Sequence, residues 1–392
     1  MLLSIAAEAS EAWLDVERAY IRQSPNATSP VIGLLERGDR VQVAEESGAP
    51  EGWTLLHPFG AVRSRYLAAV PPEGTGAPFD YLYGRVIARS AEVRSSASSE
   101  ARVVGHHARG HVLAFKPPTA GPGEWLERPD GTFLARADVK FLVGSALEGV
   151  SEPPPELAWV LRRVRVHAPD DPKGATAVLE RYTALEVFSV GSKVQTSRGT
   201  VPRDAIRLSH AHPRPAGIGP QERWVHVDTL EQVLTAYEGD HLVFATLVST
   251  GKRGWETPTG LFRVWLKLRH GEMRGRRAAY LVEEVPHSLF FGEDTALHGA
   301  NWHDRFGTAV SHGCINLSPA DAAWLFRWAP PELPEGWHGI LPGSAGLQAL
   351  WVSIEHGDAH QAAAARATAR SARNALPAEC SGLTENGAGT AG

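Results

Sequence analysis

The chain of 392 residues contains only two cysteines and two methionines. So few cysteines exclude disulfide bonds as the means of stabilising a chain of this length. No apolar run approaches the length needed to cross a bilayer, so we expect no membrane span. The net charge is only −5, and no basic patch typical of nucleic-acid binding is present. The remaining composition is that of a globular protein, with a length that suggests two to four domains.

The two ends of the chain differ in composition from the rest. The first 13 residues, MLLSIAAEASEAW, lack a positively charged start and a full apolar core, which argues against a secretory signal, although residues 6–9 resemble a cleavage-type run. Residues 354–392 are rich in Ala, Arg and Gly, and this composition predicts a flexible tail. Cys380 lies in that tail, and we interpret it as incidental.

An internal repeat fills the first part of the chain. A Val/Ile-Arg-x-Ser start and a later tryptophan recur without gaps at an offset of 72 residues, as in Arg22 and Arg94, and in Trp53 and Trp125. Each copy reads as five short strands separated by turn signals, which favours a small β-barrel. Proline-rich connectors separate the copies. We therefore expect two units and a third, diverged unit without the tryptophan, at residues 15–70, 84–145 and 158–210.

One later stretch concentrates the residue types that acyl transfer requires. Residues 297–317 read LHGANWHDRFGTAVSHGCINL and hold Cys314 with three histidines. A thiol is a nucleophile only as the thiolate, so it needs a base or an electropositive setting. A glycine follows two of the histidines, and glycine lets a backbone N–H approach an oxyanion closely. Residues 296–298 and 314–317 predict two short strands, and a loop between them can bring His298 beside Cys314.

A helix is predicted directly after the cysteine strand. Ser318 is a favourable N-cap, Pro319 suits the first position, and an acid follows in the first turn. The helix should run over residues 320–328 and end before a Pro-Pro pair. Its positive N-terminal end is expected to favour the Cys314 thiolate modestly.

This stretch resembles the active-site signature of L,D-transpeptidase (YkuD-type) catalytic domains. That signature is a histidine, a loop, and then Ser/Thr-His-Gly-Cys-hydrophobic-Asn/Arg, which here is His298 followed by SHGCIN at residues 311–316. The TPTG of residues 257–260 extends the resemblance, which covers roughly residues 223–351. The repeats resemble bacterial SH3-like domains. We therefore expect a mainly β protein, with tandem small SH3-like β-barrels followed by a β-sandwich-like catalytic domain with few helices at residues 222–353.

The resemblance also implies roles for individual residues. Cys314 would be the acylated nucleophile and His298 its base, with the carbonyl of Gly299 orienting the imidazole. Family members often have serine where this chain has Gly299, so only a backbone carbonyl remains for that task. The pocket would be shaped by His312 and Gly313, and substrate would be bound by Tyr280, Trp302, His303, Arg305, Ser311 and Asn316. Trp302 would either stack on substrate or pack the loop.

The activity implied is that of a peptidoglycan L,D-transpeptidase. The enzyme would take a tetrapeptide stem from its terminal D-Ala onto the cysteine and pass it to an amine, with no cofactor or metal. The amine would belong to a second peptidoglycan stem peptide or to a wall-attached lipoprotein. This function places the protein in the periplasm or at the cell wall, where the SH3-like units would bind the wall, space the domains or cover the active site.

Other interpretations of the same residues remain open. Water in place of the amine would make the protein an L,D-carboxypeptidase or endopeptidase, and an inactive site would leave a non-catalytic wall-binding protein. A single buried cysteine is often only a small apolar residue. A zinc site built from Cys314 and the three histidines 298, 303 and 312 is a further possibility, but the paired cysteines of structural zinc sites are absent.

Overall fold

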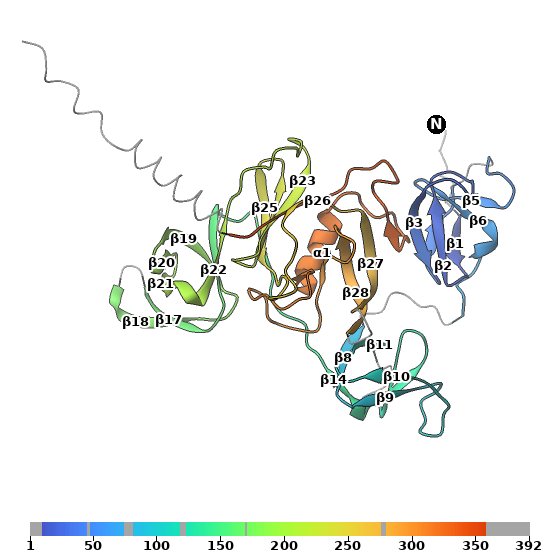
Figure 1. Cartoon of the computed structure of the whole chain (residues 1–392), viewed down its shortest axis with the longest axis horizontal. Helices are drawn as coiled ribbons and strands as arrows, with labels where there is room; N and C mark the ends of the chain where they lie inside the picture. The colour runs from blue at the N-terminus through green and yellow to red at the C-terminus, as the bar shows by residue number, and fades with distance from the viewer. Residues whose placement is uncertain are drawn as a thin grey trace, which may run out of the picture.

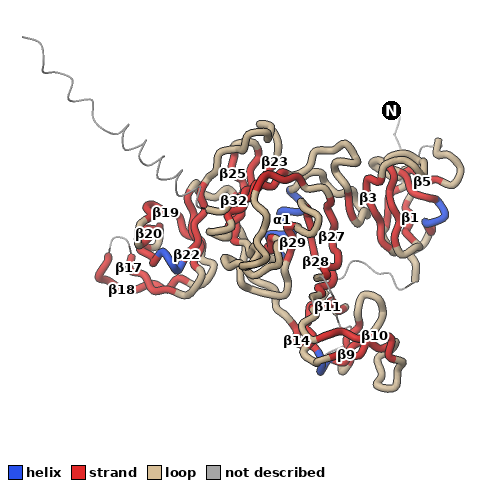
Figure 2. The backbone as a smooth tube through the Cα atoms, in the orientation of Figure 1, coloured by secondary structure: helices blue, strands red, loops and turns tan. Residues whose placement is uncertain are grey.

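A computed structural model describes residues 10–44, 48–73, 81–117, 123–168, 171–275 and 280–357. The run at residues 6–9, Cys380 and the predicted tail beyond residue 357 lie outside these ranges. Figure 1 shows four bodies, with the catalytic part in the centre and the three N-terminal units around it. Strands and loops make up nearly all of the described chain, as the tube in Figure 2 shows, and α1 (Pro319–Trp328) is its one α-helix. No helix in this part of the chain is both long and apolar enough to span a bilayer.

The first two units repeat the same order of elements. The first consists of β1 (Glu11–Leu14), β2 (Arg18–Arg22), β3 (Val31–Glu36), β4 (Arg40–Gln42), β5 (Trp53–Leu55), β6 (Ala61–Arg63), η1 (Ser64–Tyr66) and β7 (Leu67–Ala68). The second consists of β8 (Leu82–Val86), β9 (Ser90–Arg94), β10 (Val103–Ala108), β11 (Val112–Phe115), β12 (Trp125–Glu127), β13 (Phe133–Ala135), η2 (Arg136–Asp138) and β14 (Val139–Phe141). Strands β2, β3, β5 and β6 recur as β9, β10, β12 and β13 after 72 residues, which confirms the repeat.

The third unit follows β15 (Val150–Ser151) and has a core of its own. It contains β16 (Glu156–Val160), β17 (Val164–Ala168), β18 (Asp171–Leu179), β19 (Ala184–Val190), β20 (Lys193–Thr196), β21 (Gly199–Pro202), η3 (Arg203–Ala205) and β22 (Ile206–His210). Like the other two units, it ends in a strand, a 3-10 turn and a strand. In all three units the sheets of the described residues are open, so the expected barrel closure is not confirmed.

The catalytic part is built from two sheets and the helix. Its elements are β23 (Arg223–Asp228), β24 (Val233–Glu238), β25 (His241–Leu247), β26 (Gly260–Arg263), β27 (Leu266–Arg274), β28 (Leu281–Phe290), β29 (Ala296–Gly299), β30 (Ile315–Leu317), α1, β31 (Gly339–Ile340) and β32 (Trp351–Glu355). One sheet has the order β15-β25-β24-β23-β32-β26, and β27 to β31 belong to the other. Both sheets and α1 contribute to one apolar core, which Leu234, Leu297 and Leu325 represent.

Hydrogen-bonded strands join the first two units to this catalytic part. The larger sheet runs β14-β8-β11-β28-β27-β31-β3-β2-β6-β5, with β29 and β30 attached through β28. On one side β3 pairs with β31, where Leu34 faces Gly339, and on the other β11 meets β28 at Val112 and Val282. The first two units therefore extend the catalytic sheet at opposite edges, although proline-rich connectors had suggested separated domains.

The predicted helix is confirmed as α1, which begins one residue earlier than expected. Ser318 is its N-cap, and its side chain accepts a hydrogen bond from the backbone N–H of Asp321. Pro319 occupies the first position, where its missing N–H costs nothing. The ring of Trp324 stacks on Phe244 of β25 with 4.0 Å between ring centroids, so α1 packs against both sheets.

We expect Asp321→Ala to destabilise the catalytic part strongly. The buried carboxylate accepts hydrogen bonds from the Gly149 N–H (2.7 Å) and the Thr246 hydroxyl (2.5 Å). Alanine would leave both donors without a partner, at a cost of roughly 3 kcal/mol. Chemical unfolding followed by tryptophan fluorescence measures the change. The exposed pair of Asp240 with Arg214 provides the control, since Asp240→Ala should cost less than about 1 kcal/mol.

Candidate active site

Two short parallel strands bring the predicted nucleophile and base to one face. In β29 and β30, Leu297 pairs with Ile315 and His298 with Asn316. Continuing this register places Cys314 opposite Ala296, two residues before His298. Side chains two residues apart point the same way, so Cys314 and His298 share a face with about 8 Å between their Cα atoms. The leucine and isoleucine face the apolar core on the other side.

His298 is held as a neutral imidazole with one nitrogen free to act as a base. Its side chain is 1% exposed, and burial lowers its pKa to about 4. Nδ1 lies 3.0 Å from the carbonyl oxygen of Gly299 and donates to it, so Nε2 carries the lone pair. This is the orienting hydrogen bond that the sequence predicted. The ring also stacks on Trp302, with 5.7 Å between centroids.

The Cys314 thiol is protonated at neutral pH in this structure. The residue is half-buried, and Sγ lies 3.7 Å from the carbonyl oxygen of Asp294. Burial raises the pKa of the thiol to about 11, and the Asp294 carboxylate acts in the same direction. The sequence had predicted a modest shift toward the thiolate from the helix end, and desolvation outweighs that effect. The site therefore holds a neutral thiol and a neutral imidazole rather than an ion pair.

The alkylation rate of Cys314 should rise with pH throughout the range in which the protein stays folded. Below a pKa of about 11 the thiolate fraction grows about tenfold per pH unit, so the rate with iodoacetamide should increase about 100-fold from pH 7 to pH 9. The measurement needs the Cys380→Ala variant, which leaves a single thiol. A plateau below pH 8 would show instead that the thiolate is already stabilised in the free protein.

Backbone and hydroxyl groups shape the loop before the cysteine. The Ser311 hydroxyl donates to the Cys314 carbonyl (2.6 Å) and accepts from the Gly313 N–H (3.1 Å). Gly313 has a φ of +121°, a value that favours glycine. Ser311 is 7% exposed, and its hydroxyl makes both of these hydrogen bonds within the loop. The Gly313 N–H, expected to face an oxyanion, is engaged by this hydroxyl.

Thr257, the first residue of the TPTG stretch, ties this loop to the strand end after β25. Its hydroxyl accepts from the Gly251 N–H (2.9 Å) and donates to the Gly313 carbonyl (2.8 Å). The neighbouring Ser249 exchanges two backbone hydrogen bonds of 2.9 Å with Asn316. The sequence identified TPTG only as part of the resemblance and gave no partner for it, because the loop that it contacts lies more than fifty residues away.

Gly299 is required by space as well as by its carbonyl. A Cβ at this position would lie 2.9 Å from Cγ of Pro286 and 3.2 Å from the Cβ of Ala322 in α1. Real Cβ atoms avoid such distances, so β29 can lie this close to β28 and the helix only with glycine. A larger residue such as serine would therefore require Pro286 or the helix to move.

The exposed rim near the thiol contains two predicted and two unpredicted residues. Burial raises the pKa of Tyr280, which also lies close enough to Cys314 for the two groups to interact electrostatically. The Tyr280 and His312 rings are 5.2 Å apart. On the other side of His312, Lys252 Nζ lies 3.0 Å from Nε2, and Trp255 meets the ring edge-on at 5.0 Å. Lys252 and Trp255 gave no signal in the sequence beyond their position in a Gly-rich loop.

The remaining predicted substrate-binding residues organise the intervening loop. Trp302 is only 8% exposed, so its ring packs the loop and His298 and offers a ligand little surface. The Arg305 N–H donates to Nδ1 of His303, and Nε2 lies 2.8 Å from the side-chain amide of Asn316, which is itself 4% exposed. Burial lowers the pKa of His303 to about 4, so this link is neutral. Of this group, only the Arg305 side chain is exposed.

A metal at the cysteine is not favoured by the arrangement. In the part of the chain that the structure describes, the histidine, cysteine and acidic ligand atoms that converge are those of Glu36, His270 and His338. Neither Cys314 nor the histidines of its loop take part in that group. The zinc interpretation of residues 298, 303, 312 and 314 therefore gains no support.

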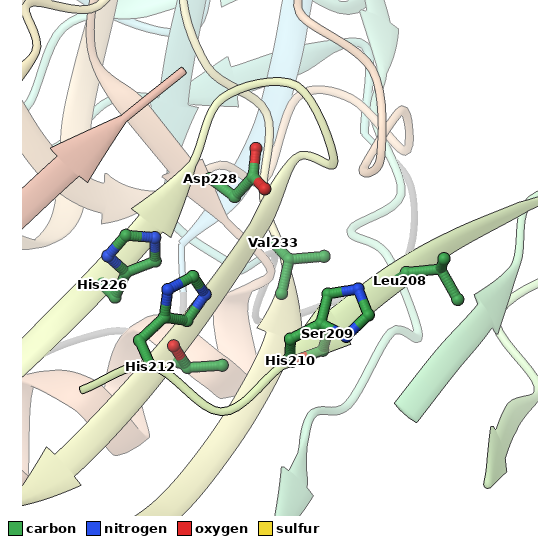
Figure 3. A pocket seen from close by; sticks show the side chains of 8 residues that line it. Leu208, Ser209, His210, His212, His226, Asp228 and Val233 are labelled. Carbon is green, nitrogen blue, oxygen red and sulfur yellow. The ribbon is translucent and has the colours of Figure 1, made fainter. Parts of the chain in front are cut away.

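A small cavity lies elsewhere, between the third unit and the catalytic part. Figure 3 shows His212 and His226 side by side there, with Asp228 further along β23. The two rings stack with centroids 3.5 Å apart, and the cavity volume of about 10 Å³ suits one water molecule. It contains none of the predicted site residues, so we assign it a packing role.

Comparison with known proteins finds similarity in the second half of the chain. Residues 222–343 match the family model of the L,D-transpeptidase catalytic domain, YkuD. A putative L,D-transpeptidase, YciB, from Bacillus subtilis (strain 168) is 27% identical over 167 residues, which are 38% of this chain and 84% of that protein.

Solved structures of the same family are also similar to the chain. The L,D-transpeptidase (Yku) from Stackebrandtia nassauensis is 23% identical over 36% of this chain and 58% of its own, with a TM-score of 0.26. The L,D-transpeptidase from Mycobacterium smegmatis is 20% identical over 44% and 77%, with a TM-score of 0.28. The chain thus spans less than two thirds of the Stackebrandtia structure. These scores are low, and the assignment rests on the family model and the Bacillus relative.

Proposed function

We propose, from the L,D-transpeptidase catalytic domain that residues 222–343 form, that this chain cross-links peptidoglycan stem peptides through a thioester on Cys314. The observation that supports this most directly is the β29–β30 register, which puts Cys314 and His298 on one face. The free Nε2 of a neutral His298 and a partly accessible thiol are the two groups that acyl transfer requires.

In the first half of the reaction, the thiol proton passes to Nε2 of His298 while sulfur bonds to the carbonyl carbon before the terminal D-Ala. Because the imidazole is neutral at pH 7, its Nε2 is available to accept the proton as the thiol attacks. The oxyanion is held by backbone N–H groups of Gly313 and Cys314, each worth about 10²-fold in rate. The Gly313 N–H must exchange the Ser311 hydroxyl for the oxyanion, which makes this donor dependent on substrate.

In the second half, the carbon–nitrogen bond breaks, and His298 returns the proton to the departing D-Ala amine. The amine of a second stem peptide then attacks the thioester, forms the new amide and restores the thiol. One amide is exchanged for another, so the reaction needs no ATP. An amine of a wall-attached lipoprotein could take the same place as acceptor.

The rim residues are suited to hold a stem peptide next to the thiol. Trp255 is 52% exposed, which leaves its face open for the apolar parts of a stem. The Lys252 ammonium, 3.0 Å from His312, offers a positive charge to a peptide carboxylate. Arg305 is a second exposed cation on the loop between β29 and β30.

We also propose that the three N-terminal units are SH3-like modules that bind the wall or set the distance to it. The 72-residue repeat and the shared strand, 3-10 turn and strand at the end of each unit support a common origin. With this function, the protein works in the periplasm or at the cell wall. A pulldown with purified peptidoglycan would test wall binding by comparing the full chain with a variant that lacks residues 222–357.

Mass spectrometry of reaction products tests the central proposal. The full chain is incubated with purified tetrapeptide stems, with and without an excess of acceptor stem. Release of D-Ala together with a cross-linked dimer is expected. A tripeptide formed at the same rate with and without acceptor would identify a carboxypeptidase, and no product from any stem would contradict both activities.

A further inference from the structure

A cluster of metal-ligand side chains lies where the first unit joins the catalytic part. Glu36 is the last residue of β3, His270 lies in β27, and His338 directly precedes β31. These strands are neighbours in the order β27-β31-β3. The Arg269 N–H donates to the His338 carbonyl, and the His338 N–H donates to the Leu34 carbonyl. The backbone therefore fixes the three side chains relative to one another.

The distances suit a small cation with nitrogen and oxygen ligands. One ligand atom from each of the three residues lies within 4.8 Å of the other two, and Nδ1 of His338 is 3.5 Å from Oε2 of Glu36. In a tetrahedral zinc site with bonds of about 2.0–2.1 Å, neighbouring ligand atoms are about 3.3 Å apart. A side-chain adjustment of about an ångström would complete such a triangle.

The buried Nδ1 of His338 is free of hydrogen bonds within the described residues and so could act as a metal ligand. Its side chain is 2% exposed, and Nδ1 has no hydrogen-bond partner among the described residues. The imidazole also forms a hydrogen bond to the backbone carbonyl of His270. Because Nδ1 has no partner in the described part of the chain, Nε2 is the donor in this bond and Nδ1 carries the lone pair. A ring nitrogen that donates to a carbonyl while the other binds metal is the common arrangement of histidine ligands.

His270 has a contact with a carboxylate. Its Nδ1 lies 2.6 Å from Oε2 of Glu284, in the adjacent strand β28. In a metal-bound state this contact would hold the proton on Nδ1 and leave Nε2 for the metal, as in carboxylate–histidine–zinc triads. The T-shaped packing of the two histidine rings, with centroids 4.6 Å apart, keeps both close to Glu36.

The charges around the cluster permit a cation. Arg18 pairs with Oε1 of Glu36 at 2.6 Å, which leaves Oε2 toward His338, and Arg269 is paired with Asp39. Two guanidinium groups thus face the three carboxylates of Glu36, Asp39 and Glu284. The surroundings are negative by one charge when both histidines are neutral.

We propose that Glu36, His270 and His338 bind one Zn²⁺ ion, with water as the fourth ligand and Glu284 supporting His270. Two imidazoles and one carboxylate are a ligand set that zinc accepts. The ion links β3 of the first unit to β27 and β31 of the catalytic part, so it clamps the two together. Cys314 and His298 lie outside this set, so the ion has no part in the acyl transfer.

Direct metal binding tests the proposal independently of activity. The full, untagged chain is prepared as Cys314→Ser, which removes a competing thiol, freed of metal and titrated with Zn²⁺ against a chelating dye. One equivalent per chain is expected. Glu36→Gln and His270→Gln should each weaken binding by about 100-fold or more, and Glu284→Gln by about 10–100-fold. X-ray absorption should find two imidazoles in the zinc shell.

A matched histidine–glutamate pair provides the control. His241 lies 2.9 Å from Glu152 on an exposed surface, and His241→Gln should leave zinc affinity unchanged. Circular dichroism of the metal-free variants checks that each is folded, and Glu36→Gln keeps the test valid if a histidine variant does not fold. A chain that binds less than one equivalent, or folded Glu36→Gln and His270→Gln variants with the parent affinity, would overturn the proposal. His270 would then serve only as a protonated bridge between Glu284 and Glu36.

Discussion

Cys314→Ala should abolish the covalent adduct that a carbapenem forms with this protein. The β-lactam carbonyl is attacked by the same sulfur that attacks the stem peptide, and alanine has no nucleophile to replace it. Intact-mass spectrometry should show one added carbapenem on the wild-type chain and none on the variant. Transfer activity on stem peptides should fall by at least about 10⁴-fold.

The other cysteine provides the control for this prediction. Cys380→Ala should be labelled like the wild type, since we interpret that residue as incidental. Because Cys314 is half-buried, its replacement by alanine should leave the unfolding midpoint close to the parent value. Loss of the adduct then reports the missing thiol and not a misfolded chain. An adduct on Cys314→Ala, or none on the wild type, would remove the basis of the proposed mechanism.

The local parts of the fold were predictable because they follow from repeated or strongly patterned sequence. The 72-residue offset of Arg22 and Arg94 carries over to whole strands, β2 to β9 and β3 to β10. Ser318 and Pro319 identified the start of α1 to within one residue. The first strand of the first unit, β1, begins at Glu11, four residues before the start expected for that unit.

The joining of units through one sheet was not predictable. Pairing of β3 with β31 uses open strand edges, and an edge carries no sequence signal for its partner. Gly33 shows how specific the contact is, since a Cβ there would lie 2.6 Å from the Trp337 ring. The two residues are about three hundred positions apart, so only the folded chain reveals why glycine is needed.

The active site was likewise predictable only in part. The residue types of the SHGCIN motif indicated Cys314 and His298, and the orienting carbonyl of Gly299 followed from the lack of a serine. The sequence could not predict the direction of the pKa shift at the Cys314 thiol. Desolvation raises this pKa and the helix N-terminus lowers it, and which effect is larger depends on the residues that cover the sulfur. It also missed Lys252, whose approach to His312 depends on loop contacts.

Folding stability should fall steeply between pH 6.5 and pH 4. Burial lowers the pKa of four histidines to about 4, namely His107, His287, His298 and His303. Burial lowers the pKa of a fifth, His338, to about 3. The unfolded chain takes up these protons near pH 6.5 and the folded chain only near pH 4, so acid favours unfolding. A shift of this size corresponds to about 3 kcal/mol per histidine. Above pH 6.5 all five are neutral in both states, and their contribution is constant.

Buried carboxyl groups act in the opposite direction. Burial raises the pKa of Asp39, Glu283 and Asp321, so these groups bind protons more readily in the folded chain and gain stability as the pH falls. Five histidines outnumber three carboxyl groups, and the net loss should be several kcal/mol at pH 4. Urea midpoints at pH 7, 6, 5 and 4 measure it.

A single substitution can separate the histidine effect from general acid unfolding. His287 has a φ of +57°, a region in which asparagine is tolerated, so His287→Asn removes a titrating ring without new backbone strain. Its stability should depend on pH with a slope smaller by about one proton between pH 6.5 and 4. His241→Asn, at an exposed position, provides the matched control substitution. Equal unfolding free energies at pH 7 and pH 5 in the parent chain would contradict the lowered pKa values of these buried histidines, including that of His298.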